Sequence, residues 1–155
     1  MLTIIVVGEQ LLALGFLLLT LSGDIEPNPG PNNAMSYLSI CHINIQSLSE
    51  LKLAAIGNHI AELYDVITLS ETFLNVNISF PLDITGFQAI FRKDRPDRAG
   101  GGVAVYVSDR IPAKRRSDLD LADVEMLWLE LRVSSGKLLL GTCYQLHFGT
   151  PFNTH

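Results

Sequence analysis

The sequence predicts a layered α/β domain with a mixed sheet in which most strand pairs are antiparallel. Three observations lead to this class. The chain has 155 residues, which is enough for one modest domain and too few for two well-packed ones. A strand, a helix and a second strand follow one another between residues 37 and 70. Further strand-like runs follow, separated by Gly, Pro or charged loops, so we expect a single core.

The first strand and the helix are predicted between residues 37 and 63. Tyr37–Asn44 is short, rich in β-forming residues and bounded by polar segments. Ser47 and Glu50 fit a capping box, in which the serine oxygen accepts a backbone N–H and the glutamate reaches back. Gly57 costs this helix about 1 kcal/mol. Apolar residues recur at helical spacing at Leu48, Leu51, Ala55, Ile56, Ile60 and Leu63.

Strands account for most of the remaining chain. Asp65–Ser70 is a compact β-branched run, typical of a strand that is buried on both faces. Residues 133–137 fit a hairpin turn that joins the last two strands. The other strands are expected at Phe87–Arg92, Gly102–Val107, Val124–Val133 and Leu138–Tyr144.

Residues 1–22 are expected to lie outside this domain. They include an apolar run from Leu11 to Leu21, which is too short to span a bilayer by itself and about the length of the apolar part of a signal peptide. No Lys or Arg precedes this run. A signal-like or ribosome-tunnel segment is favoured over a core helix, and residues 32–36 form a polar linker to the domain.

A nine-residue segment, Gly23–Pro31, separates the apolar run from the linker. It resembles the 2A-type ribosome-skipping peptide, whose pattern is Asp-x-Glu-x-Asn-Pro-Gly-Pro, and every fixed position of that pattern is filled. The resemblance implies that the ribosome does not join Gly30 to Pro31 and that the second product begins at Pro31. The competing interpretation is an ordinary Pro-rich turn or linker.

The charge of the chain is unevenly distributed. The net charge is −5, from 11 Lys and Arg against 16 Asp and Glu, and by itself this argues against nucleic acid as a partner. Residues 92–116, however, hold eight basic and three acidic residues, a local charge of +5 that leaves −10 for the rest. This basic segment keeps nucleic acid open as a partner.

Cys41 and Cys143 are the only cysteines, and each lies in an apolar, strand-like run. No Cys-x-x-Cys spacing or neighbouring His pair supports a zinc site. Two buried, reduced thiols are favoured, and a single Cys41–Cys143 disulfide is the alternative.

Two polar residues stand where buried strands are expected to end. Asn44 ends the first strand, and Glu71 follows Asp65–Ser70. Side chains at the same end of neighbouring strands converge on one rim of a sheet, and amide and carboxylate oxygens are hard ligands suited to Mg²⁺. Outside such a context, Asn at a strand end is more often a turn former and Glu before Thr a helix cap.

Several short segments occur together in a characteristic order. The series resembles the endonuclease/exonuclease/phosphatase family, which is DNase I-like and apurinic-endonuclease-like, in the form carried by LINE-type (non-LTR) retrotransposons. The resemblance covers residues 37–144, and its order and spacing are more specific than any single motif. Skipping peptides also occur at the front of such retrotransposon proteins. The matching segments are His42–Leu48, Ile67–Leu74, Phe91–Arg95, Gly100–Val107, Val124–Leu131 and Gly141–Tyr144.

The resemblance implies a Mg²⁺- or Mn²⁺-dependent nuclease that nicks DNA. It implies that Glu71 binds the metal, that Asn44 helps to position phosphate and metal, and that the Tyr144 hydroxyl binds the scissile phosphate. The implied fold is the N-terminal half of a four-layered α/β sandwich, and a lone half would expose an apolar sheet face. Four basic residues are implied to follow the DNA backbone with salt-dependent affinity: Arg92, Lys93, Arg95 and Arg98.

The resemblance stops after Tyr144. Residues 145–155 form an unrelated tail, with Gln145-Leu146-His147 where the family has Arg-Pro-Pro. The Gly-Asp-x-Asn segment, the later Asp and the terminal Ser-Asp-His, which supply the family's remaining ligands and its general base, have no counterpart here. We therefore expect a fragment with negligible hydrolysis, because one metal-binding Glu cannot also deprotonate the nucleophile. In an intact element, the missing half and a reverse transcriptase would follow.

Two other functions stay open from the sequence. The first alternative is a non-catalytic secreted or nucleic-acid-binding module. In this alternative the first 30 residues act as a targeting peptide. The second alternative keeps the same fold but changes the substrate to phosphoinositides or nucleotides. The Gly-rich and basic segments favour DNA over these substrates. The retrotransposon resemblance implies a nuclear or cytoplasmic protein, whereas the targeting peptide implies the secretory pathway.

Overall fold

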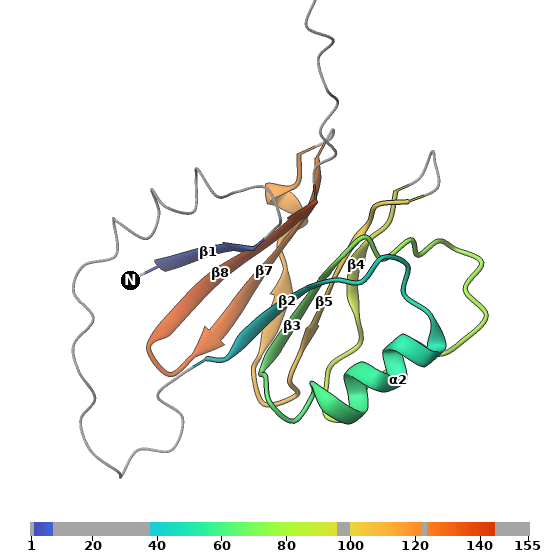
Figure 1. Ribbon diagram of the computed structural model, residues 1–155. Coiled ribbons are helices and arrows are strands. Elements are labelled where there is room, and N and C mark those ends of the chain that lie inside the picture. The colour runs from blue at the N-terminus through green and yellow to red at the C-terminus, as the bar shows by residue number, and fades with distance from the viewer. Residues whose placement is uncertain (1, 8–37, 96–99, 122–123, 145–155) are drawn as a thin grey trace, which may run out of the picture.

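The computed structural model describes residues 2–7, 38–95, 100–121 and 124–144. The strands among these residues form two sheets that face each other (Figure 1). In the first sheet β2 and β3 are parallel, and the other neighbouring strands are antiparallel. Its strand order is β2 (Ile40–Asn44), β3 (Val66–Ser70), β5 (Val103–Val107) and β4 (Phe91–Lys93).

The second sheet contains three antiparallel strands and one parallel edge strand. The antiparallel strands are β6 (Ala113–Arg115), β7 (Glu125–Val133) and β8 (Gly136–Tyr144), and a short 3-10 helix, η1 (Ser117–Leu119), follows β6. The edge strand is β1 (Leu2–Val7), which pairs with β8. Part of the segment expected outside the fold therefore belongs to a sheet, and residues 8–22 lie outside the described residues.

The helix α2 (Glu50–His59) begins later than the predicted capping box. Ser49 is the N-cap, and its Oγ accepts the Lys52 N–H at 3.3 Å. Ser47 has a φ of 74°, and its N–H donates to the Glu71 carbonyl at 2.8 Å, so Ser47 belongs to a loop contact and not to the helix. Among the described residues, no helix is long and apolar enough to cross a membrane.

Two apolar clusters hold the layers together. One lies between the two sheets, and the other lies between the first sheet and α2, which covers the outer face of that sheet (Figure 1). All five residues of β3 are buried, as predicted for a strand covered on both faces. The inner cluster contains Val66, Val103, Val105, Val107, Ile111, Leu127, Leu129, Leu131, Leu138 and Leu140.

The mixed α/β class with mostly antiparallel pairs is confirmed, but the expectation of one sheet is wrong. The last two predicted strands form a separate sheet whose apolar side covers the first sheet. The expected exposed apolar sheet face is also not found within the described ranges, because the exposed large apolar side chains there lie in α2 or in loops. They are Leu51, Leu63, Phe73, Val76 and Leu121.

Both cysteines are free thiols, as predicted. Cys41 lies in β2 of the first sheet, and Cys143 lies in β8 of the second. Burial raises the pKa of both thiols. Both are therefore protonated at neutral pH, and neither has the thiolate character of a reactive cysteine.

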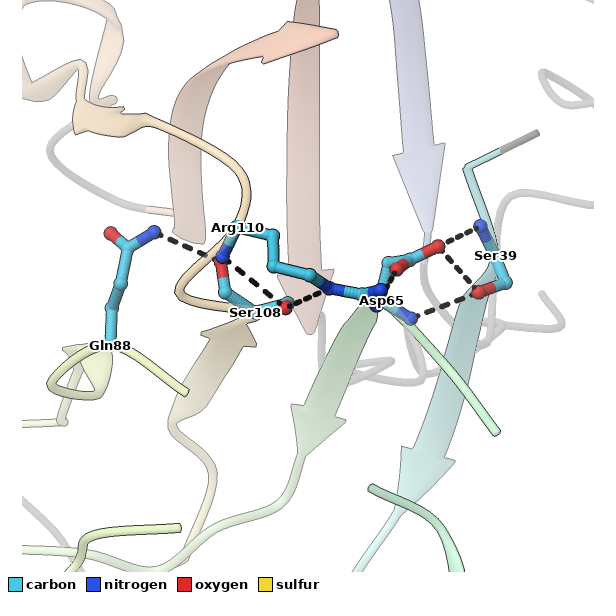
Figure 2. Close-up of polar contacts among 5 residues, drawn as sticks. All are labelled: Ser39, Asp65, Gln88, Ser108 and Arg110. Carbon is cyan, nitrogen blue, oxygen red and sulfur yellow. Dashed lines mark hydrogen bonds and ion pairs between the residues drawn. The ribbon is translucent and has the colours of Figure 1, made fainter. Parts of the chain in front are cut away.

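A polar network closes the end of the first sheet where β3 begins (Figure 2). The Asp65 carboxylate accepts the Ser39 N–H at 3.0 Å, the Ser39 hydroxyl at 2.7 Å and Arg110 Nη2 at 2.8 Å. Arg110 Nε donates to the Ser108 hydroxyl, and Gln88 Nε2 donates to the Ser108 carbonyl, each at 3.2 Å. Burial raises the pKa of Asp65, but the Ser39 hydrogen bonds and the Arg110 charge outweigh it, so the pKa lies below its usual value.

Candidate functional site

The two strand-end residues predicted to converge do meet. Asn44 ends β2 and Glu71 follows β3, and because these strands are parallel their carboxyl ends share one rim of the sheet. Asn44 Nδ2 donates to Glu71 Oε1 at 3.0 Å. Asn44 Oδ1 accepts the Gln46 N–H at 3.2 Å. The amide therefore orients the Glu71 carboxylate and directs its own oxygen to the backbone.

The rim is built from strained loops. Gln46, Ser47, Glu71 and Phe73 have φ values of 44°, 74°, 54° and 55°, in the left-handed region that costs a non-Gly residue about 1–2 kcal/mol. Strain of this kind clusters at functional sites, where surrounding contacts hold it. The loop contacts here are Ile45 N to Ser70 O at 3.0 Å, Ser47 N to Glu71 O at 2.8 Å and Leu48 N to Thr72 O at 2.8 Å.

Lys52 holds the first of these loops from α2. Its ammonium donates to the carbonyl oxygens of Ile45 at 2.7 Å, Gln46 at 2.8 Å and Ser47 at 3.0 Å. The ammonium has three N–H donors, and each of them is bound to one of these backbone carbonyls. Lys52 therefore stabilises the loop that follows Asn44 with all three of its N–H donors.

A glycine loop forms the other side of the rim. Gly100, Gly101 and Gly102 have φ values of 93°, 70° and 84°, which only glycine adopts readily. The Phe73 N–H donates to the Gly101 carbonyl at 2.9 Å, and the Thr72 N–H donates to the Gly102 carbonyl at 3.3 Å. These bonds fix the residues that follow Glu71. The Thr72 hydroxyl is buried and has no hydrogen-bond partner among the described residues.

Tyr144 reaches the same rim from the second sheet. It ends β8, and its direct cross-strand partner is Glu125, the first residue of β7. Burial raises the pKa of the Tyr144 phenol, and the hydrogen bond and negative charge of Glu71 raise it further, against an opposing charge on Arg95. The phenol is therefore protonated at neutral pH and lies beside Glu71. Asn44, Glu71 and Tyr144 are thus brought together from three strands.

The basic residues predicted to contact DNA have partners within the protein. Arg92 pairs with Asp94 at 3.4 Å. Lys93 donates to the carbonyl oxygens of Leu121 at 3.2 Å and Val124 at 3.0 Å. Arg95 forms an ion pair and a hydrogen bond with Glu125, and Arg98 lies outside the described residues. Their cationic groups are partly neutralised, so DNA contact by this segment stays a prediction.

The donor set at the rim fits a loosely held Mg²⁺. Among the described residues, no group of three or more His, Cys, Asp or Glu could hold a metal ion. Glu71 is a carboxylate without a cationic partner among those residues, whereas both oxygens of Glu125 are bound to Arg95 and the Gly102 N–H. One carboxylate suffices when water and substrate phosphate complete the octahedron around Mg²⁺. Glu71 is the residue that would hold it, and the second predicted ligand, Asn44, lies beside it.

Three contributors to the rim escaped prediction: Lys52, His42 and Glu125. His42 Nδ1 lies 2.9 Å from Thr68 Oγ1 and its Nε2 lies 3.3 Å from Ser70 Oγ, which places the ring on two hydroxyls of β3. The sequence carried a signal for Glu125 only, as an acidic residue near the start of a predicted strand.

No protein-family model matches the chain, and no curated protein matches it. Gly30 and Pro31, the predicted skipping position, lie outside the described residues, as does the tail at residues 145–155. The family and its activity therefore stay proposals.

Proposed function

We propose that this chain contains the N-terminal half of a Mg²⁺-dependent DNA endonuclease of the endonuclease/exonuclease/phosphatase type, from a LINE-type retrotransposon. In this proposal the rim binds Mg²⁺ and a phosphodiester but hydrolyses it negligibly. The meeting of Asn44, Glu71 and Tyr144 at one rim carries the proposal. These are the three residues to which the family resemblance assigns a role in binding metal and phosphate.

Each residue has a defined task. When bound, Mg²⁺ would polarise a phosphodiester oxygen and stabilise the charge on the leaving group. Glu71 supplies the carboxylate ligand, and the Asn44 amide holds that carboxylate in one orientation. The protonated Tyr144 phenol, which lies near Glu71, is a hydrogen-bond donor suited to a phosphate oxygen.

Among the described residues, the rim lacks a group poised to remove a proton from water. Glu125 is bound by Arg95 and the Gly102 N–H, and the ring nitrogens of His42 contact Thr68 and Ser70. Neither side chain is poised beside Glu71 as a general base, and positioning without a base accounts for only part of a nuclease's rate. Negligible cleavage by this chain alone is the consequence.

The layer order supports the same family. One helix, the first sheet and the second sheet form three successive layers within the described residues. The proposed four-layered sandwich requires one more helical layer on the outer face of the second sheet. Met126 and Trp128, on β7, are half-buried on the strand side opposite the inner cluster and would contact such a layer.

The segment Gly23–Pro31 supports a retrotransposon origin. We propose that translation separates the chain between Gly30 and Pro31, because all fixed positions of the skipping pattern are present. Cell-free translation of the full reading frame then gives two products, and Pro31→Ala gives one. A single product from both templates would contradict the proposal.

Metal-dependent DNA binding tests the proposed function. The full chain and Glu71→Gln are titrated with a fluorescent DNA duplex, with and without Mg²⁺, and nicking of supercoiled plasmid is followed in parallel. We expect Mg²⁺ to tighten binding to wild type but not to Glu71→Gln, with no nicking above background. Metal-independent binding that Glu71→Gln leaves unchanged would overturn the proposal. Nicking abolished by Glu71→Gln would show that the rim has a base after all.

The same titration separates the alternatives. A phosphoinositide-type domain would prefer a soluble inositol phosphate over DNA, again with dependence on Glu71. A secreted binding module would show no dependence on metal. The local charge of +5 in residues 92–116 favours DNA, although most of its described basic residues are engaged in ion pairs.

A further inference from the structure

We infer that Glu125 and Arg95 form a clasp that positions Glu71, an inference that rests on the proposed metal role of Glu71. Glu125 begins β7 in the second sheet, whereas Glu71 follows β3 in the first sheet. Arg95 lies two residues after β4. The clasp therefore ties the two sheets together at the rim where the proposed metal site lies.

Every oxygen of the Glu125 carboxylate is occupied. Oε2 accepts the Gly102 N–H at 2.6 Å, and Oε1 accepts Arg95 Nε and forms an ion pair with Arg95 Nη2. The side chains are only 12% exposed for Arg95 and 17% exposed for Glu125. A partly buried carboxylate with three donors is held firmly, so Glu125 is an anchor for the glycine loop and not a metal ligand.

The glycine loop connects Glu125 to the residues that follow Glu71. The carbonyl oxygens of Gly101 and Gly102 accept the N–H groups of Phe73 and Thr72, the two residues after Glu71. Glu71 and Phe73 both have positive φ, at 54° and 55°. A backbone in this region persists only where its surroundings fix it. The clasp supplies that support from the second sheet.

The two glycines show how closely the clasp packs on the loop. A Cβ on Gly101 would overlap Glu125 Oε2 and lie 2.6 Å from Arg95 Nη2. A Cβ on Gly102 would lie 2.6 Å from Thr72 Oγ1. The carboxylate and the guanidinium therefore lie directly against the loop backbone, and a shift of either moves the loop.

This assignment changes the predicted role of Arg95. Its guanidinium is committed to Glu125, so it positions the rim and does not follow the DNA backbone. Mutation of the outer partners of a metal ligand typically weakens metal affinity about 10- to 100-fold. Glu125 and Arg95 are accordingly positioning residues, which act on Glu71 through the glycine loop.

The test uses the full chain, ¹⁵N-labelled, with Glu125→Gln compared with Glu130→Gln. Glu130 lies on the same strand and is also ion-paired, with Arg116 at 3.2 Å and Lys137 at 2.8 Å, but it makes no contact with the glycine loop. The first readout is the Asn44 side-chain NH₂ resonance, because this amide donates to Glu71. The second is Mn²⁺ affinity, from paramagnetic broadening at Glu71.

We expect Glu125→Gln to shift the Asn44 NH₂ resonance and to weaken Mn²⁺ binding about tenfold, and Glu130→Gln to change neither. A folded Glu125→Gln variant that leaves the Asn44 resonance unchanged would overturn the clasp. If Glu125→Gln does not fold, Arg95→Gln, which leaves the Gly102 bond in place, is judged by the same readouts. If wild type binds no Mn²⁺ at Glu71, the proposed function fails, and the Asn44 resonance still decides the clasp.

Discussion

Asn44 and Glu71, 27 positions apart in the chain, are joined by a hydrogen bond of 3.0 Å from the side-chain amide to the carboxylate. The bond couples the ends of β2 and β3 at the rim. A neutral amide at this position holds Glu71 without adding a second negative charge, which would raise the pKa of one of the two carboxyl groups. The amide thereby holds the Glu71 carboxylate in one orientation at the rim.

Removal of the Asn44 amide is expected to weaken the rim. Asn44→Ala loses the hydrogen bonds to Glu71 and to the Gln46 N–H, and we expect the free energy of unfolding to fall by about 1–2 kcal/mol. Urea unfolding measures the change. Asn75→Ala is the matched control, because Asn75 binds only the Asn77 N–H in an exposed turn, at 2.8 Å. Equal losses in both variants would contradict this account of Asn44.

Asp65 is expected to make stability depend on pH at the other end of the sheet. Because its folded pKa is lowered, it contributes stability that is present in full above its unfolded pKa of about 3.9 and is lost as pH falls through the folded pKa. At pH 7, Asp65→Asn should lower the free energy of unfolding by about 1–2 kcal/mol, mainly through the Ser39 bonds, because Arg110 is 66% exposed.

The difference between wild type and Asp65→Asn should shrink as the pH is lowered below 4, which urea unfolding across a pH series can follow. Asp118→Asn serves as the control, because the Asp118 side chain is 59% exposed in its pair with Arg116 and should contribute little. A difference for Asp65→Asn that stays constant from pH 7 to pH 3 would refute the role given to its carboxylate.

Two glycines with similar backbone angles should differ in their tolerance of alanine. Gly86 has a φ of 83° and open space where a Cβ would stand. Gly86→Ala should therefore lower the free energy of unfolding only through the unfavourable backbone conformation, by about 1–2 kcal/mol. Gly101 has a φ of 70°, and its Cβ would overlap Glu125, which should add about 1–3 kcal/mol. Thermal unfolding of both variants measures the difference, and equal melting temperatures would argue against tight packing at Gly101.

Gly57 offers a stabilising substitution. It lies within α2, and a Cβ there would lie 3.9 Å from Ile84 Cγ2, an ordinary contact distance. Gly57→Ala should therefore raise the free energy of unfolding by about 1 kcal/mol, through higher helix propensity. Circular dichroism during thermal unfolding provides the measurement. A lower melting temperature would mean that the helix packs more closely on Ile84 than described.

Local pattern predicted the central strands well and the helix start poorly. The β-branched and alternating runs at β3, β5 and β7 match the observed bounds to within one residue, because burial dictates their composition. Ser47 fits a helix cap locally, but its N–H is taken by the Glu71 carbonyl from another strand. The division into two sheets was also missed, since strand periodicity does not say which sheet a strand joins.

Only the part of the candidate site that lies at the ends of strands could be predicted from the sequence. Asn44 ends one predicted strand and Glu71 follows the next, so their meeting could be inferred from the sequence. The bonds of Lys52 to three carbonyls and of Glu125 to the glycine loop depend on where separate elements come together. The ion pair of Arg95 with Glu125 could not be foreseen, because a positive charge in a sequence does not reveal its partner.

The measurement that tests the central claim most directly is a Mn²⁺ titration of the ¹⁵N-labelled full chain and of Glu71→Gln. The account predicts saturable paramagnetic broadening that is strongest at the rim, around Glu71, Asn44 and Tyr144, and that disappears in Glu71→Gln while the other resonances keep their positions. Broadening that is absent from the rim in wild type, or that persists in Glu71→Gln, would contradict a metal site built on this carboxylate.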